Sequence, residues 1–263
     1  MSRMAAWACA GVWLAVVAAG PAQALTIMEM DYQCPVGGER FRQETAGSGT
    51  AFGHYLDGQA YGPIMSPWPL AKCPGNGFVM YRDDFSPAEL EVLTAFVQGQ
   101  AYQQLRQTET TYWLAASLQE ALGVSLVDRA GTLMRATWQA SPAQYPHYVE
   151  AAATAFAAAC PDDAAHTQRD EQWLYCQLIR GEWERRSSRF DAARARFERL
   201  QPLPPQLVGD ADARAQYASE VAQQLALVEQ GDARRTMASM AGKDAGVAGD
   251  VEAAADAAAD PGR

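Results

Sequence analysis

The sequence lacks the short motifs that mark several large classes of enzyme. It contains no Gly-x-Ser-x-Gly nucleophile elbow, no His-Glu-x-x-His metal helix and no Cys-x-x-Cys redox pair. Residues 46–49 (Ala-Gly-Ser-Gly) lack the Gly-Lys-Ser/Thr ending of a phosphate-binding loop and are interpreted as a flexible turn. The chain has three histidines, His54, His147 and His166, which leaves few candidates for acid–base catalysis. No specific activity follows from the sequence, and a binding protein is favoured over an enzyme.

Basic residues are also scarce relative to acidic ones. Lysine and arginine together number 21, aspartate and glutamate 31, and the formal net charge is -10. This surplus of negative charge argues against general binding to nucleic acid or to an anionic membrane. After residue 24 no apolar run reaches the length of about 20 residues that a membrane-spanning helix needs. We therefore expect no nucleic-acid partner and, once the leader is removed, no stable membrane insertion.

The first 24 residues have the pattern of an export signal. Arg3 supplies a positive start, residues 4–19 are almost entirely apolar, and Ala-Gln-Ala at 22–24 has the small-x-small form of a cleavage site. We predict cleavage after residue 24 and a periplasmic or secreted protein. Cleavage removes Cys9 and leaves four cysteines, an even number that favours two disulfides in an oxidising compartment.

The rest of the chain divides into three zones. Residues 25–84 are rich in glycine, proline and aromatic side chains, which predicts a small β-rich module of short strands and turns. Residues 85–230 have helical periodicity. Residues 231–263, rich in Ala, Gly and Asp, have no aromatic side chain to bury, and we predict a disordered tail there. The sequence therefore predicts a mainly α fold, in which the β-rich module precedes an antiparallel helical region.

The first expected helix has a clear start signal. Ser86 is an N-cap residue, Pro87 takes the first helical position, and Glu89 follows three residues after the cap. Apolar spacing predicts further helices, and the short loops between them favour antiparallel neighbours. The expected bounds of these helices are about 112–123, 126–138, 148–160, 168–187, 190–200 and 211–230.

Two stretches of the β-rich module share a five-residue frame. Residues 34–38 are Cys-Pro-Val-Gly-Gly, and residues 73–77 are Cys-Pro-Gly-Asn-Gly. A zinc knuckle would have Cys-Pro-x-Cys-Gly at each place, and two such knuckles would supply four thiolates to one tetrahedral site. The turn residues are therefore present while half of the metal ligands are missing.

A third stretch, residues 178–205, resembles a tetratricopeptide repeat. Gly181 and Ala193 are small residues that would let two helices approach, and Phe190 and Phe197 would fill the space beside them. The Trp-x-x-Leu-Gly start of such a repeat is absent, and one unit is fewer than the ~3 that a freestanding solenoid needs. An ordinary helical hairpin remains the alternative.

Together these features resemble a bacterial family of unknown function, in which paired Cys-Pro-x-Cys-Gly knuckles precede a tetratricopeptide-like helical region. The resemblance extends from about residue 30 to residue 200. It implies a zinc-ribbon-like module followed by helices, and it implies no substrate. Gly37 and Asn76 depart from the family pattern because they stand where the second cysteines would bind zinc.

Cys34 and Cys73 have two interpretations. Bonded to each other, they would close a loop of roughly 40 residues and stabilise the fold by about 4 kcal/mol. As metal ligands they would need further partners, and His54 with Glu39 or Asp57 would be the candidates for a mixed zinc site. We favour the disulfide, because exported thiols tend to be oxidised, and we expect no cofactor.

Cys160 and Cys176 form the second predicted pair. Cys160 ends one expected helix and Cys176 lies inside the next, so a disulfide would tie the two helices together. Two buried, unpaired thiols are the alternative.

For function, we predict a protein–protein interaction or scaffold module whose concave helical surface holds a protein or peptide partner. Trp173, Arg180 and Trp183 are the expected contact residues, although helix packing explains Trp173 equally well. The rival hypothesis is an envelope enzyme or metal-binding protein with a cleft between the two modules. It requires the three polar candidates for the mixed zinc site to converge in a pocket.

Overall fold

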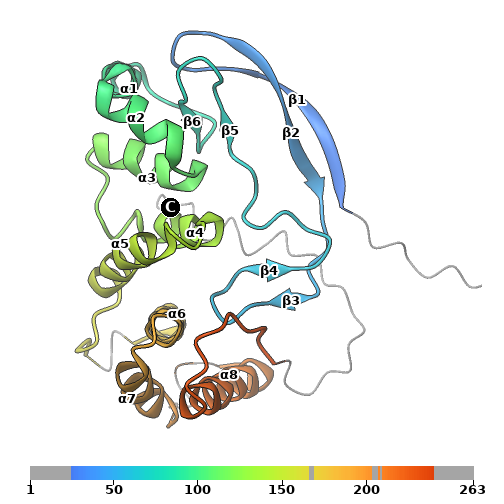
Figure 1. The fold of residues 1–263 in the computed structure, drawn as a ribbon, viewed down its shortest axis with the longest axis vertical. Coiled ribbons are helices and arrows are strands. Elements are labelled where there is room, and N and C mark those ends of the chain that lie inside the picture. Colours follow the sequence, from blue (N-terminus) through green and yellow to red (C-terminus); the bar gives the residue numbers. More distant parts are fainter. Residues whose placement is uncertain (1–24, 166–168, 203–206, 208, 240–263) are drawn as a thin grey trace, which may run out of the picture.

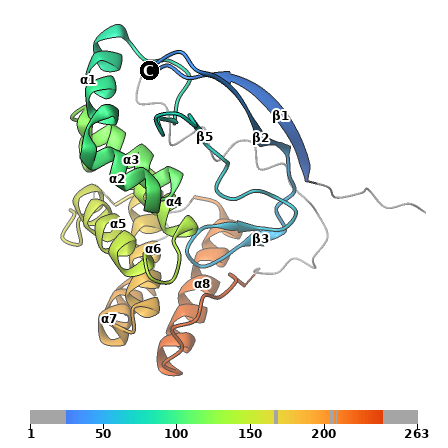
Figure 2. The same ribbon diagram turned by 45° about the horizontal axis from the view of Figure 1, so that its top comes forward.

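The computed structural model describes residues 25–165, 169–202, 207 and 209–239 (Figures 1 and 2). The predicted signal peptide, residues 1–24, and residues 240–263 of the predicted tail lie outside these ranges. Within them the strands end at Met80 and helices make up most of the remainder. The predicted mainly α fold with a small β-rich part at its start is confirmed.

The described residues contain three two-stranded antiparallel sheets followed by eight helices. The strands are β1 (Thr26–Gln33), β2 (Arg40–Ser48), β3 (Gly53–His54), β4 (Ala60–Tyr61), β5 (Ala71–Lys72) and β6 (Val79–Met80). The helices are α1 (Pro87–Gln98), α2 (Gln100–Thr108), α3 (Thr111–Ala121), α4 (Ala130–Gln139), α5 (Tyr145–Ala159), α6 (Glu171–Arg186), α7 (Phe190–Leu200) and α8 (Ala211–Glu229).

β1 and β2 form a long hairpin that arches beside the helices (Figure 1), and residues 26–48 are called the ribbon below. Asp31 lies opposite Arg42, and Tyr32 lies opposite Phe41, whose ring stacks on that of Tyr32 with 5.5 Å between centroids. Almost every residue of β1 is exposed. The ribbon therefore contributes little to the core along most of its length.

The helix start signals were accurate. Ser86 Oγ accepts a hydrogen bond from the backbone N–H of Glu89, and the Glu89 carboxylate accepts one from the backbone N–H of Ser86 at 2.8 Å, which completes the predicted capping box. The other six predicted helices correspond to α3–α8, with bounds close to those expected. The remaining helix, α2, was not predicted. Its sequence is polar on average, and its apolar stripe consists of buried Tyr102 and partly buried Leu105, too few residues for apolar spacing to predict a helix.

Two large cores and a small third cluster, formed by Tyr112, Ala136 and Tyr148, organise the described residues. The larger core is built from α4–α8 with part of α3. In the smaller core, side chains of the two cysteine turns and of β6 pack directly against α1–α3. The predicted division at residue 84 therefore separates no independent β-rich core. The buried members of the smaller core are Cys34, Val36, Cys73, Phe78, Val79, Leu93, Val97, Tyr102, Leu114, Ala115 and Leu118.

α6 and α7 form the close helical hairpin expected from residues 178–205. Ala193 and Phe197 of α7 are fully buried. A Cβ atom placed on Gly181 would lie 2.6 Å from Cε1 of Phe197, too close for any real side chain. The hydrogen at Gly181 therefore permits the approach of the two helices, as the repeat-like spacing predicted.

Residues 231–239, called the strap below, are held against the β3–β4 hairpin. Leu56 donates its backbone N–H to the carbonyl of Thr236 at 3.0 Å, and Ala238 donates to the carbonyl of His54 at 2.9 Å. Tyr55 and Met237 pair between these bonds as an antiparallel bridge. The prediction of a disordered tail was wrong for this stretch, because backbone pairing rather than an apolar helix face fixes it.

We expect Gly181→Ala to lower the free energy of unfolding by about 1–3 kcal/mol, the usual cost of overpacking a core. Gly131→Ala in α4 is the matched control, because its Cβ would meet no atom closer than Arg135 Nη1 at 3.5 Å. The control should leave stability unchanged or raise it by up to about 1 kcal/mol. Urea denaturation followed by circular dichroism measures both. Equal stability of the two variants would contradict the close packing of α6 on α7.

Candidate functional site

The two cysteine turns have the same backbone geometry. In the first, Cys34 donates its N–H to the Glu39 carbonyl at 2.8 Å, and its own carbonyl accepts from Gly38 at 3.1 Å. In the second, Cys73 donates to the Phe78 carbonyl at 2.8 Å and accepts from Gly77 at 2.9 Å. Gly38 and Gly77 have φ values of +72° and +80°, which explains the glycine that closes both frames. The repeated sequence thus encodes a repeated turn.

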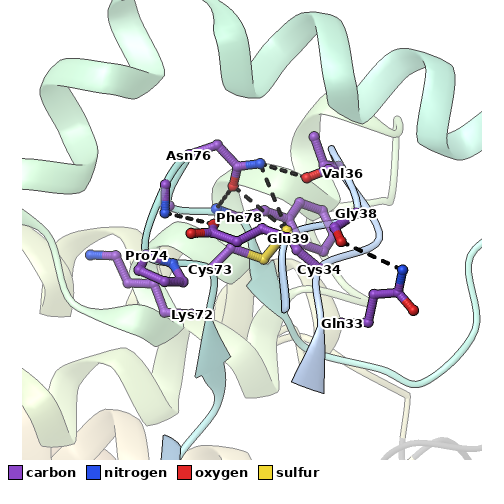
Figure 3. The surroundings of a disulfide bond; sticks show 12 residues. Gln33, Cys34, Val36, Gly38, Glu39, Lys72, Cys73, Pro74, Asn76 and Phe78 are labelled. Atoms are coloured by element: carbon purple, nitrogen blue, oxygen red, sulfur yellow. Dashed lines mark hydrogen bonds between the residues drawn. A yellow bond between two sulfur atoms is a disulfide. The ribbon is translucent and has the colours of Figure 1, made fainter. Parts of the chain in front are cut away.

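The turns face each other and are joined by a disulfide (Figure 3). The Cα atoms of Cys34 and Cys73 are 5.8 Å apart, within the normal range for a disulfide, and both residues are buried. A sequence separation of 39 gives the bond a chain-entropy contribution of about 4 kcal/mol. Cys160 and Cys176 are also bonded, with Cα atoms 6.2 Å apart, and link the end of α5 to α6. Both predicted pairings are present in the structure.

Asn76 joins the two turns beside the disulfide (Figure 3). Its side-chain amide donates to the Val36 carbonyl at 2.7 Å and lies 3.7 Å from the sulfur of Cys34. Its side-chain oxygen accepts from the Phe78 backbone N–H at 2.8 Å. A Cβ on Gly37 would lie 3.7 Å from the Asn76 amide nitrogen. Positions 34, 37, 73 and 76 therefore face one another, as the four ligand positions of paired knuckles would.

Helix α2 binds the second turn through its backbone carbonyls. Arg106 donates to the carbonyls of Gly75 at 2.8 Å and Pro74 at 3.2 Å. Gln103 donates to Asn76 at 2.9 Å. Figure 3 shows the tip of this turn beside Glu39 of the first turn, whose carboxylate accepts from the Gly75 N–H at 2.8 Å.

Tyr102 completes this set of carbonyl contacts. Its hydroxyl is buried and donates to the Gly77 carbonyl at 2.8 Å. Burial raises the pKa of the Tyr102 hydroxyl well above its ordinary value, which keeps the group protonated as a donor. Four consecutive carbonyls, from residue 74 to residue 77, are thus each bound by a side chain of α2.

The predicted zinc-site residues do not converge in the structure. Both cysteine sulfurs are bonded to each other, and Glu39 is held by the second turn. His54 of β3 instead contacts Glu220 of α8 at 3.0 Å. Within the described ranges, no three His, Cys, Asp or Glu side chains gather as a metal-binding group.

Asp57, the remaining candidate, sits at the tip of the β3–β4 hairpin and is almost fully buried. Its carboxylate accepts from Arg186 of α6 at 2.8 Å and from Arg235 of the strap at 2.7 Å. Its carbonyl accepts from the indole N–H of Trp138 in α4 at 3.1 Å. Buried carboxylates are stabilised by such pairing, so Asp57 fastens the hairpin and the strap to the helices.

The predicted partner-binding residues are packed inside the helical region. Trp183 is fully buried, and Trp173 is 9% exposed and donates its indole N–H to the Pro161 carbonyl at 2.9 Å. Arg180 binds Asp162 at 2.8 Å and the Cys160 carbonyl at 3.2 Å. The three side chains are therefore engaged within the helical region. These large side chains fill the α5–α6 junction, where their size stabilises packing rather than an interface.

The ribbon presents apolar side chains that the sequence analysis did not identify. Met28 and Met30 are each 42% exposed, and Ile27 is 50% exposed. Met28 and Met30 alternate with Glu29 and Asp31, so the methionines lie on one face and the carboxylates on the other. This alternation over residues 28–31 was the available signal. A long strand was not predicted from it, because glycine and proline elsewhere in the module favoured short strands.

Comparisons of the chain with protein-family models, curated proteins and solved structures find no match. In the described part of the chain, no helix is both long enough and apolar enough to cross a membrane.

We expect the reduced Gly37→Cys/Asn76→Cys variant to bind one Zn²⁺. The variant restores Cys-Pro-x-Cys-Gly in both turns, and binding energies of about 10–16 kcal/mol for structural zinc exceed the strain of a side chain at Gly37, where φ is +90° and the cost is about 1–3 kcal/mol. Zinc stoichiometry by a chromogenic chelator measures the outcome. The Asn76→Cys variant, with three thiols, is the control and should bind zinc more weakly. Absence of zinc from the double variant would contradict the convergence of the four positions.

We expect the coupling between His54 and Glu220 to depend on pH. Its hydrogen bond to Glu220 raises the pKa of His54 above its ordinary value of about 6.5, and the charge of Asp57 adds to this effect. The stabilisation is therefore complete below about pH 6.5 and is lost as the pH rises through the folded-state pKa.

A double-mutant cycle with His54→Gln and Glu220→Gln, measured by urea denaturation, tests this coupling. The His54 side chain is 39% exposed, so the coupling at about pH 5.5 should stay below about 1 kcal/mol and approach zero at about pH 9. A coupling that grows with pH would refute the assignment.

Proposed function

We propose that this chain is an exported protein-binding module and that the ribbon is the surface that contacts its partner. The observation that supports this most directly is the exposure of Ile27, Met28 and Met30 on one strand. Single exposed apolar residues are ordinary, whereas Met28 and Met30 share one face of β1 with the half-buried Tyr32, and exposed Ile27 adds apolar surface on the other face. Methionine side chains are flexible and polarisable, which suits them to binding surfaces.

Export is the second part of the proposal. The two disulfides suit an oxidising compartment, such as the periplasm or the extracellular space. The signal-like sequence of residues 1–24 points the same way. The surplus of acidic side chains favours a protein partner over nucleic acid.

The ribbon replaces the concave helical surface as the proposed interface. The three helix residues expected to contact a partner are buried or engaged within the helical region. The ribbon, by contrast, is joined to the body at its turn and along β2 through Gln43, and it leaves β1 exposed (Figure 2). A surface so held needs little ordering when a partner binds.

A photoreactive amino acid placed at position 30 tests the proposal in cells that export the protein. We expect irradiation to produce a discrete crosslinked adduct from position 30. Position 127 is the matched control, because Val127 is 45% exposed, similar to Met30, but lies in the helical region between α3 and α4. Adduct mass on a denaturing gel and by mass spectrometry is the readout.

Adducts of equal yield from positions 30 and 127, or none from position 30, would overturn the proposal. Adducts from position 127 alone would return the interface to the helical region. Both variants must retain two disulfides, shown by intact mass with and without reduction, so that a misfolded ribbon is not read as a missing partner.

A further inference from the structure

We infer that the partner binds as an added β-strand along the outer edge of β1, and that this strand alternates apolar with basic side chains. The inference rests on the proposed function of the ribbon and specifies the mode of binding and the chemistry of the partner. It follows from three observations: an open backbone edge, two chemically different faces, and a charge pattern that disfavours other occupants.

The edge of β1 is open in the described structure. β1 pairs with β2 alone, and no backbone hydrogen bond reaches β1 from any other described segment. Contacts with the body run through β2 instead: Gln43 donates to the Leu70 carbonyl at 3.2 Å and accepts from the Lys72 N–H at 3.0 Å. An eight-residue strand extends about 26 Å, and its outward N–H and C=O groups can pair with an extended segment.

The two faces of β1 specify what the added strand carries. A neighbouring strand places its side chains about 4.5–5.5 Å from those of β1 on each face. On one face these neighbours would be Met28, Met30 and the half-buried Tyr32, which favour apolar side chains. On the other they would be Ile27 at the start of the strand and then Glu29 and Asp31, whose side chains are 55% and 79% exposed and favour lysine or arginine.

The ion pairs of Glu29 and Asp31 with Arg42 leave room for a second basic side chain on this face. Arg42 binds Asp31 at 2.7 Å and Glu29 at 3.1 Å from β2, the inner side of the hairpin. A strand on the outer side of β1 would meet the same two carboxylates from the opposite direction. Their high exposure leaves lone pairs for a second cation there.

A second copy of the chain is a poor occupant of this edge. Antiparallel pairing of β1 with itself about a twofold axis keeps each face on its own side of the sheet. Every register centred on residues 29–31 then sets Glu29 or Asp31 of one chain against Glu29 or Asp31 of the other. Like charges directly opposite one another destabilise a sheet.

The C-terminal residues of this chain are an equally poor occupant of the β1 edge. Residues 240–263 contain five acidic residues and two basic ones, so this segment would also bring negative charge to Glu29 and Asp31. A separate polypeptide with alternating basic and apolar residues is the occupant that complements both faces. Binding by strand addition takes affinity from the backbone and specificity from the alternating side chains.

The test uses synthetic decapeptides and the disulfide-bonded, exported protein. The first probe alternates valine and lysine, and the second has the same composition arranged as five valines followed by five lysines. We expect the alternating peptide to shift the amide resonances of residues 26–33 and to slow their hydrogen exchange. The block peptide carries the same charge but cannot match both faces, and it should bind at least fivefold more weakly.

Two charge variants at directly opposed positions provide a matched pair. Glu29 on β1 lies across from Glu44 on β2, and both change from glutamate to lysine. Glu29→Lys should weaken the alternating peptide about fivefold, the upper end for one cross-strand charge pair. Glu44→Lys, one strand further from the peptide, should change affinity less than twofold, because water and salt screen charge over that distance.

The inference is overturned if the block peptide binds as well as the alternating one, if the two variants are equally affected, or if exchange slows outside residues 26–33. Concentration-dependent protection of β1 without peptide would assign the edge to a second copy. Crosslinking from position 30 together with no peptide binding would retain the ribbon as an interface and reject strand addition. Absence of crosslinking rejects the proposed function itself, so the two failures are distinct.

Discussion

The two cysteine turns, and the ribbon whose two strands the first of them joins, depend on the hydrogen bonds between α2 and the second cysteine turn. A turn leaves its carbonyls pointing outward, and burying them without partners costs free energy for each group. From one short helix, Tyr102 and Gln103 bind the carbonyls of Gly77 and Asn76 in the more buried half of the turn, and Arg106 binds the two carbonyls at its exposed tip. The turn can therefore pack against α1–α3 and share their core. Without α2, neither the buried disulfide nor the first turn attached to it would have a platform.

From that platform the ribbon is held at its turn, through Gln43 in the middle of β2, and beyond the far end of β2. The disulfide, Asn76 and Glu39 fix the turn that joins β1 to β2. Beyond the far end of β2, the β3–β4 hairpin is fastened by buried Asp57, which binds Arg186 of α6 and Arg235 of the strap. β1 pairs with β2 and carries the exposed methionines. A surface fixed in this way loses little conformational entropy on binding, so its exposed backbone edge is already arranged for a partner.

Local signals predicted much of the fold, and the sites that depend on polar contacts were missed. The capping box at Ser86 and the apolar spacing of α3–α8 report directly on one helix each, and cysteine parity reports on the disulfides. α2 and the strap are held by hydrogen bonds to segments distant in sequence, which hydrophobic periodicity cannot indicate. The complete burial of Trp183 was not predicted for a related reason: a large aromatic residue on a helix has the same sequence signature whether it faces solvent or a core.

The two cysteine turns are joined by one disulfide, and the contacts around them show what else holds them together. A tetrahedral ion fixes two knuckles through four bonds, whereas a disulfide fixes them through one and leaves rotation about that link. The Asn76 amide donates to the Val36 carbonyl beside the disulfide, and the Gly75 N–H donates to the Glu39 carboxylate at a second place between the turns. The two hydrogen bonds together oppose rotation about the disulfide. Each is a neutral or charge-assisted hydrogen bond worth about 0.5–3 kcal/mol, less than a zinc–thiolate site supplies. The paired turns also share a core with α1–α3, so their packing against these helices adds to what the disulfide and the two hydrogen bonds supply.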